Sequence, residues 1–194
     1  MGELAVSEFR LLQQQKDLFL NNVATWAPAQ LRLCCKPGSW SALQVLDHVI
    51  RTERGILAEI QKNVRQCDRV AFVHRVKSDL LILLMRSPAR VKVPGLVSRV
   101  ILPGNEIDLV ELIAAWNESQ TQLEQWASEL RENQTGYAGF RHPVSGWMSV
   151  LQAIMFLAAH VRHHRYQLGR IRRHARWPQA GAATTAGSGR PTAQ

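Results

Sequence analysis

The sequence has few cysteines and no long apolar run. Its three cysteines, Cys34, Cys35 and Cys67, are an odd number without CxxC spacing, which argues against a disulfide framework. No apolar stretch approaches the roughly 20 residues that a membrane-spanning helix needs. The first residues have neither the basic nor the apolar region of a signal peptide. We therefore expect a cytoplasmic protein with free thiols and no membrane contact.

Acidic residues are also in the minority. The chain has 24 Lys and Arg against 15 Asp and Glu, a net charge of +9. Six arginines lie in the segment "RHHRYQLGRIRRHARW", residues 162–177. We favour a solvated basic face at the end of a helix, where cations interact well with the helix dipole. Nucleic-acid binding through this helix is the alternative, but no nucleic-acid-binding motif accompanies the arginines.

Amphipathic helical spacing dominates the rest of the chain. Apolar residues at three- and four-residue steps predict four long helices, over residues 3–25, 40–64, 105–133 and 147–175. Ser39 is the expected N-cap of the second helix, and Asn105 or Asp108 that of the third. Residues 70–86 form either a shorter separate helix or an extension of the second.

The connections between these helices are long. Residues 87–105 contain three prolines and two glycines, and residues 136–146 also lack helical spacing, so both are expected to be loops. No series of strands competes with the helices. We predict an all-α four-helix bundle with long interhelical connections, formed by residues 1–177 as a single domain. Residues 178–194 are predicted to be a disordered tail.

The last predicted helix carries three histidines. Its segment "LAAHVRHHRYQLGRIRRH" contains His160, His163 and His164. On a helical wheel, His160 and His164 fall within the apolar stripe, His163 falls at its edge, and Arg162 faces solvent. Two imidazoles one turn apart on a buried face are a common arrangement in metal sites.

The pair alone does not decide between metal binding and packing. Two histidines supply half of a tetrahedral ligand set, so metal ligands and ordinary core residues are equally compatible with the spacing. There is no HExxH motif, which excludes that class of zinc protease. A third ligand would give an open, catalytic type of site. His48 is modestly preferred over His74, His142 and His174, because it borders the apolar stripe of the second helix.

Three segments occur in order along the chain: "GSWSALQVLDHV" at 38–49, "RHPVSGWMS" at 141–149 and "HVRHHRYQL" at 160–168. Together they resemble the DinB-like family, which includes the DinB/YfiT-like metal-binding four-helix bundles of bacteria. Each segment alone is a weak signal, but their order and approximate spacing agree with the family pattern over about residues 5–175. The resemblance implies a four-helix bundle with a histidine metal site.

The resemblance also implies roles for individual residues. The implied metal ligands are His48 on the second helix and His160 with His164 on the last. Three further residues are implied to pack around the site or border its pocket without binding the metal: His163, Gln167 and Trp40. His142, in the turn before the last helix, is implied to be structural.

The resemblance implies a metal-dependent enzyme. Imidazole ligands suit Zn or Ni best among the expected ions, with Fe or Mn as further candidates. The implied reaction is S-transfer from a low-molecular-weight thiol, such as bacillithiol or mycothiol, to a small electrophile. A stress-related metal-binding or scaffold protein without catalytic activity is the alternative within the family.

A homodimer is a further expectation, since helical bundles often pair along a helix face. Three tryptophans are candidates for such a contact, although burial in the core is the favoured interpretation of them: Trp116, Trp126 and Trp147.

Overall fold

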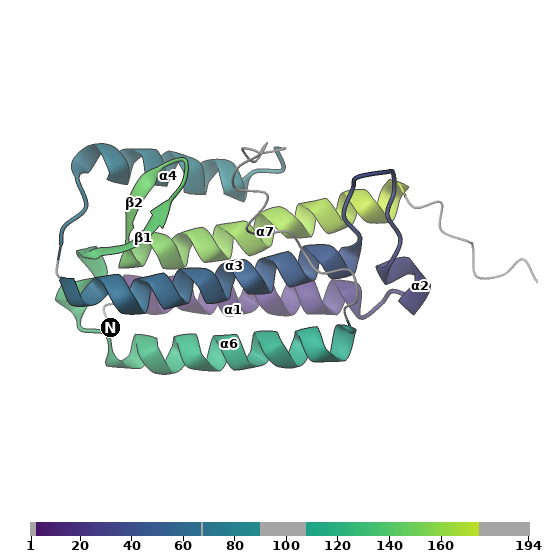
Figure 1. Cartoon of the computed structure of the whole chain (residues 1–194), viewed down its shortest axis with the longest axis horizontal. Helices are drawn as coiled ribbons and strands as arrows, with labels where there is room; N and C mark the ends of the chain where they lie inside the picture. The colour runs from purple at the N-terminus through teal and green to yellow at the C-terminus, as the bar shows by residue number, and fades with distance from the viewer. Residues whose placement is uncertain (1–2, 67, 90–107, 175–194) are drawn as a thin grey trace, which may run out of the picture.

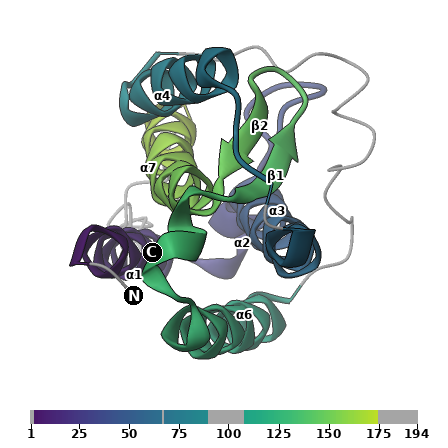
Figure 2. The same cartoon turned by 90° about the vertical axis from the view of Figure 1, so that its left-hand side faces the viewer.

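The computed structural model describes residues 3–66, 68–89 and 108–174 (Figure 1). Its four long helices are α1 (Glu3–Val23), α3 (Ala42–Asn63), α6 (Leu109–Glu129) and α7 (Val150–His174). Seen end-on, these helices surround one core, with α1 packed on α7, and α3 packed on both α6 and α7 (Figure 2). The predicted all-α four-helix bundle is therefore confirmed.

The start of α3 differs by two residues from the prediction. Ser41, not Ser39, is the N-cap: its Oγ accepts the N–H of Gln44, and the Gln44 side chain accepts the N–H of Ser41. This reciprocal capping box requires Gln or Glu three residues after the cap, which only Ser41 has. The Ser39 hydroxyl instead closes a turn with the backbone of Lys36.

The third long helix begins at one of the two predicted caps. The Asp108 carboxylate accepts the N–H groups of Val110 and Glu111. Asn105 lies outside the described residues. The helix ends at Glu129, four residues earlier than predicted, because Leu130 adopts an extended conformation. The 3₁₀ turn η2 (Glu132–Gly136) follows.

Residues 70–86 form a separate helix. The 3₁₀ turn η1 (Val64–Gln66) ends α3, and α4 (Phe72–Arg86) then lies outside the bundle against α7 (Figure 1). A shorter helix, α2 (Pro28–Leu31), follows α1 in the connection between the first two predicted helices. Pro28 occupies its first turn, where the missing proline N–H has no helical partner to lose.

The prediction of a loop over residues 136–146 is wrong. β1 (Ala138–His142) and β2 (Gly146–Ser149) form an antiparallel hairpin, with His142 opposite Gly146. Gly146 has φ = +82°, which favours glycine at this turn. The hairpin joins the bundle to the outer helix, because β1 contacts α3 and β2 contacts α4.

A buried carboxylate lies between α3 and α6. Glu53 accepts hydrogen bonds from Trp116 Nε1 at 3.1 Å, Ser119 Oγ at 2.8 Å and Gln120 Nε2 at 2.6 Å. Trp116 also packs edge-on against Phe19 of α1. Trp116 is thus a core residue, as favoured from the sequence, and Trp126 and Trp147 are half-buried. These contacts hold α6 on the bundle.

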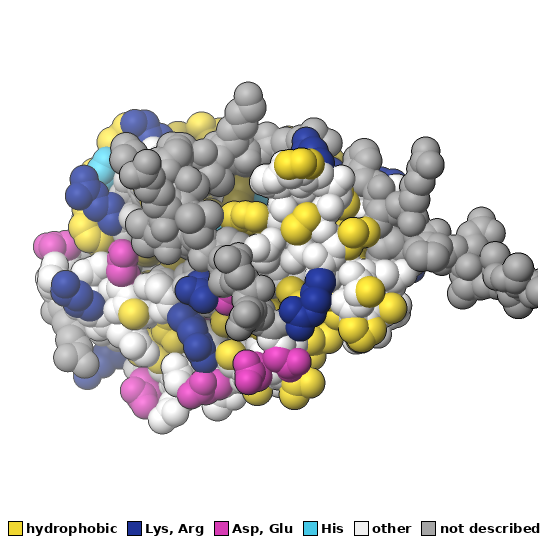
Figure 3. Space-filling view, turned by 45° about the vertical axis from the view of Figure 1, so that its right-hand side comes forward, with side chains coloured by type: hydrophobic (Ala, Val, Ile, Leu, Met, Phe, Trp, Pro, Cys, Tyr) yellow, Lys and Arg dark blue, Asp and Glu magenta, His cyan; other side chains and the backbone are white. Residues whose placement is uncertain are grey.

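The surface carries both charges. In Figure 3, acidic side chains line the lower edge of the visible face and basic side chains lie above them. An exposed ion pair between Arg54 and Glu118 joins α3 to α6. On α7, Arg162 is exposed as predicted, whereas Arg165 is half-buried and donates to Gln15 of α1.

Several predictions fall partly or wholly outside the described residues. Cys34 and Cys35 are free thiols, as predicted, while Cys67 is not described. The expected tail at 178–194 and most of the connection at 87–105 also lie outside. Of the helices that are described, none has the length and apolarity required to cross a membrane.

Candidate metal centre

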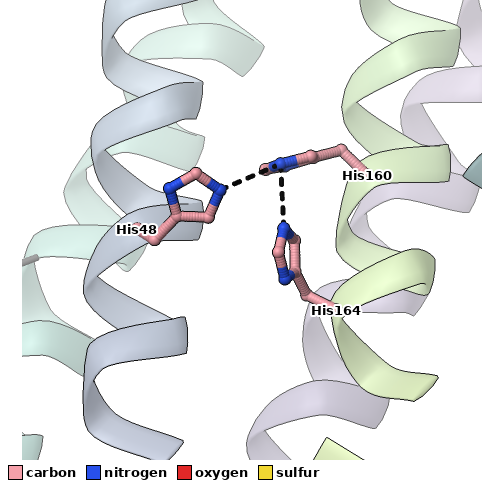
Figure 4. Close-up of side chains that lie close together, drawn as sticks. All are labelled: His48, His160 and His164. Carbon is pink, nitrogen blue, oxygen red and sulfur yellow. Dashed lines mark hydrogen bonds between the residues drawn. The ribbon is translucent and has the colours of Figure 1, made fainter. Parts of the chain in front are cut away.

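Three histidines from two neighbouring helices point toward one another in the core (Figure 4). His48 comes from α3, and His160 and His164 come from successive turns of α7. All three are buried. The structure therefore brings together the three residues that the sequence proposed as metal ligands.

The ligand atoms of these histidines converge. His160 Nε2 lies 3.3 Å from His48 Nε2 and 3.1 Å from His164 Nε2. The candidate ligand atoms of all three lie within 4.8 Å of one another. Two nitrogens bound to one tetrahedral zinc at about 2.0–2.1 Å lie about 3.3–3.4 Å apart. The donor set thus fits a divalent ion with three imidazole ligands.

Burial keeps two of these imidazoles, those of His160 and His164, in the neutral form that binds metals. Desolvation lowers the pKa of His160 and His164 well below 6.5, and the neighbouring histidines lower both values further. A neutral imidazole offers a lone pair, whereas a protonated one offers none. Among the described residues, no carboxylate or thiol joins the cluster, so a bound divalent ion would keep its full charge.

Gln167 fixes the orientation of one ligand. Its Oε1 lies 2.7 Å from His164 Nδ1, so the amide oxygen accepts a hydrogen bond from an Nδ1–H group. The other ring nitrogen, Nε2, then has its lone pair directed at the cluster. Hydrogen bonds of this kind orient metal-binding histidines and raise their basicity. The position inferred for Gln167 from the family resemblance is therefore in contact with the site.

Aromatic rings cover two of the histidines. The Trp40 ring lies 4.9 Å from that of His48, and the Phe156 ring stacks on that of His160 at 5.6 Å. Trp40 was predicted at the site, but Phe156 was not. Phe156 precedes His160 by four residues, as His160 precedes His164. Helical spacing could therefore have identified it as a neighbour of the cluster.

His163 is beside the cluster but not in it. Its ring is perpendicular to that of His164, with centroids 5.5 Å apart, and its nitrogens do not join the three converging Nε2 atoms. It is buried, although the wheel placed it at the edge of the apolar stripe. Burial, with a smaller effect from Arg170, lowers its pKa.

Two further histidines, His142 and His74, lie at the hairpin. His142 Nδ1 accepts the N–H groups of Val144 and Ser145, and burial lowers the pKa of His142 to about 4. Its ring packs edge-on against Phe156, which in turn stacks on His160. His74 lies against the hairpin at Gly146. The structural role inferred for His142 agrees with these contacts.

Replacing Gln167 is expected to weaken metal binding. In Gln167→Ala, the Nδ1 proton of His164 loses its acceptor and the ring loses its fixed orientation. Losing such a contact typically weakens metal affinity about 10- to 100-fold. Competition titration with a chelator would measure the change. Gln167→Glu keeps an acceptor at this position and should retain affinity; equal weakening in both variants would contradict an orienting role.

The fold is shared with solved structures. YfiT from Bacillus subtilis, described as a probable metal-dependent hydrolase with an unusual four-helix bundle topology, aligns with a TM-score of 0.58 and 14% identity, covering 91% of each chain. TT2238, described as a four-helix bundle protein, aligns with a TM-score of 0.53 and 16% identity, covering 86% of this chain and 98% of the other. At these identities the similarity shows the fold alone. No curated protein sequence matches the chain.

The family assignment rests on a sequence match over most of the chain. The model of the DinB superfamily matches residues 11–168, a span that includes His48, His160 and His164. It also includes the hairpin and the four long helices, apart from the first residues of α1 and the last residues of α7. Because this match covers most of the sequence, the chain belongs to the DinB superfamily.

Proposed function

We propose that this protein is a metal-dependent enzyme in which His48, His160 and His164 hold a divalent ion, most suitably Zn or Ni. The convergence of three buried Nε2 atoms is the observation that carries the proposal. Three protein ligands leave coordination positions for a small molecule. At such a position the ion would act as a Lewis acid that ionises a thiol or lowers the pKa of water.

The residues around the cluster have distinct tasks in this proposal. Neutral imidazoles bind the ion without cancelling its charge, which preserves its acidity. Gln167 orients His164 through the 2.7 Å contact with Nδ1. Trp40 and Phe156 pack on the histidine rings and limit the access of water to them. No nucleophilic side chain of the protein is needed.

The reaction we favour is S-transfer from a low-molecular-weight thiol to a small electrophile. The thiol sulfur forms a bond to an electrophilic carbon. The leaving group departs with the electrons of the broken bond and takes up the proton released by the thiol. The thiol enters as the second substrate, and the histidines remain chemically unchanged.

Hydrolysis is the second candidate. It is favoured by the similarity in fold to YfiT, which is described as a probable metal-dependent hydrolase. In this case water replaces the thiol as the nucleophile. The two candidates share the same three-histidine site and differ in the small molecule that the site activates.

One experiment separates these candidates. Protein purified without an affinity tag would be loaded with Zn or Ni and supplied with a panel of small electrophiles and esters, with and without bacterial thiols. Loss of the electrophile that requires both metal and thiol supports S-transfer, and turnover without thiol supports hydrolysis. Metal binding without turnover in either series would contradict both and leave a metal-binding or scaffold role.

A further inference from the structure

The outer helix α4 has two apolar faces, and only one of them is covered. Ser78, Ile82 and Met85 are buried on the inner face, where α4 packs on α7 and β2. The opposite face points away from the bundle (Figure 2). Its apolar side chains are 41% to 66% exposed: Val73, Val76, Leu80 and Leu83.

Exposed apolar side chains concentrate on this helix. Of the eleven large hydrophobic residues that are exposed in the described part of the chain, six belong to α4. Phe72, at 79% exposure, and Leu84 flank the four residues of the outer face. Together these six side chains present on the order of 600 Å² of apolar surface, the size of the largest patch on a typical monomer. We call them the α4 stripe.

The spacing of the stripe fits another helix. Val73, Val76, Leu80 and Leu83 follow one another at steps of three, four and three residues, which is the a/d pattern of a helix–helix seam. Such a seam consists of projecting side chains and the gaps between them, so it is complementary to a second seam of the same kind. The inner face already fixes α4 on the bundle, so pairing does not require this short helix to form on its own.

We propose that the α4 stripe is a self-association surface, through which two copies of this chain form a symmetric dimer. Pairing the two stripes would remove about 1,200 Å² of surface from water, the lower end of the range for specific interfaces. The two copies are related by a two-fold axis, because each contributes the same patch to the interface. Both patches are then occupied, so the assembly stops at two copies. Trp116, considered for a dimer from the sequence, is fully buried and plays no part.

The test is the mass of the 194-residue chain in solution, measured by sedimentation equilibrium over a range of concentrations. The wild type is expected to have twice the mass of one chain. Leu80→Lys places a charge at the centre of the stripe in both copies and should weaken dimerisation at least about a hundredfold. Because Leu80 is mostly exposed, helical content by circular dichroism should be unchanged.

Two more variants make the test specific. Leu83→Lys repeats the change at a second position of the stripe and should also give monomers. Val110→Lys makes the same kind of change at an isolated exposed position on α6 and should remain dimeric. A monomeric wild type would overturn the proposal and leave the stripe to another occupant. Dimeric Leu80→Lys and Leu83→Lys, or a monomeric Val110→Lys, would also overturn it.

Discussion

His160→Ala is expected to abolish metal binding, while His163→Ala preserves it. His160 Nε2 is the atom that lies against both other ligand nitrogens. Its loss removes the central ligand and leaves only His48 and His164. Removing a ligand costs more than removing a supporting hydrogen bond, so affinity should fall at least about a thousandfold. Elemental analysis of protein purified without a tag should find about one metal per wild-type chain and almost none in His160→Ala.

His163→Ala is the matched control for this experiment. It removes a buried imidazole from the same helix, three residues away, and creates a similar cavity. Metal content lost from both variants would indicate general damage to α7 rather than loss of a ligand. Metal retained at wild-type stoichiometry in His160→Ala would show that the three nitrogens are not its binding site.

Thermal unfolding gives an independent measurement of the same site. A ligand that binds only the folded state raises the melting temperature, and the increase grows with the logarithm of ligand concentration over Kd. Added Zn or Ni should therefore stabilise the metal-free wild type and His163→Ala, and leave His160→Ala unchanged. Each comparison is made within one variant, so the cavity left by the substitution does not affect it.

The long helices were predictable because their apolar residues repeat at helical spacing over many turns. The same spacing placed His160 and His164 on the buried face of α7, and the structure confirms this. Spacing alone did not bring His48 to them, because that requires α3 and α7 to be neighbours. The adjacency of two helices distant in sequence came from the resemblance to the DinB-like family.

The features that the sequence did not predict are of two kinds: short elements, and side chains whose partners lie far away in the sequence. The hairpin strands have five and four residues, and their sequence contains no sustained alternation of apolar and polar side chains. Glu53 was not recognised as a core residue, although it lies four residues after Val49 and three before Ile56, on the apolar side of α3. A carboxylate on that side needs donors from another helix, which the local sequence does not reveal.

Glu53→Leu is expected to be among the most destabilising single substitutions in the bundle. The leucine fills the space but accepts no hydrogen bond, which leaves Trp116 Nε1, Ser119 Oγ and Gln120 Nε2 without their acceptor. Each buried donor left unsatisfied costs about 1–3 kcal/mol, so the loss of the acceptor for all three should lower the free energy of unfolding by at least about 3 kcal/mol. Urea unfolding followed by circular dichroism would measure it.

The comparison with Glu59→Leu tests whether this loss comes from the buried contacts. Glu59 is exposed on the same helix, so its replacement should change the free energy of unfolding by less than about 1 kcal/mol. Equal effects at the two positions would mean that the loss reflects a general intolerance of α3 to leucine. In that case the three donors on α6 would not need the Glu53 carboxylate.

Glu53→Gln should change the pH dependence of stability rather than abolish folding. Burial raises the pKa of Glu53 above its ordinary value of 4.5, and the three hydrogen bonds only partly offset this. The folded state then holds the proton more tightly than the unfolded state, so stability from this group is greatest below pH 4.5 and falls as pH rises through the folded pKa.

Glutamine does not titrate. The wild type should therefore be more stable relative to Glu53→Gln at low pH than at neutral pH. Protonation of His160 and His164 destabilises both proteins alike and cancels in this difference, so a difference independent of pH would contradict the raised pKa.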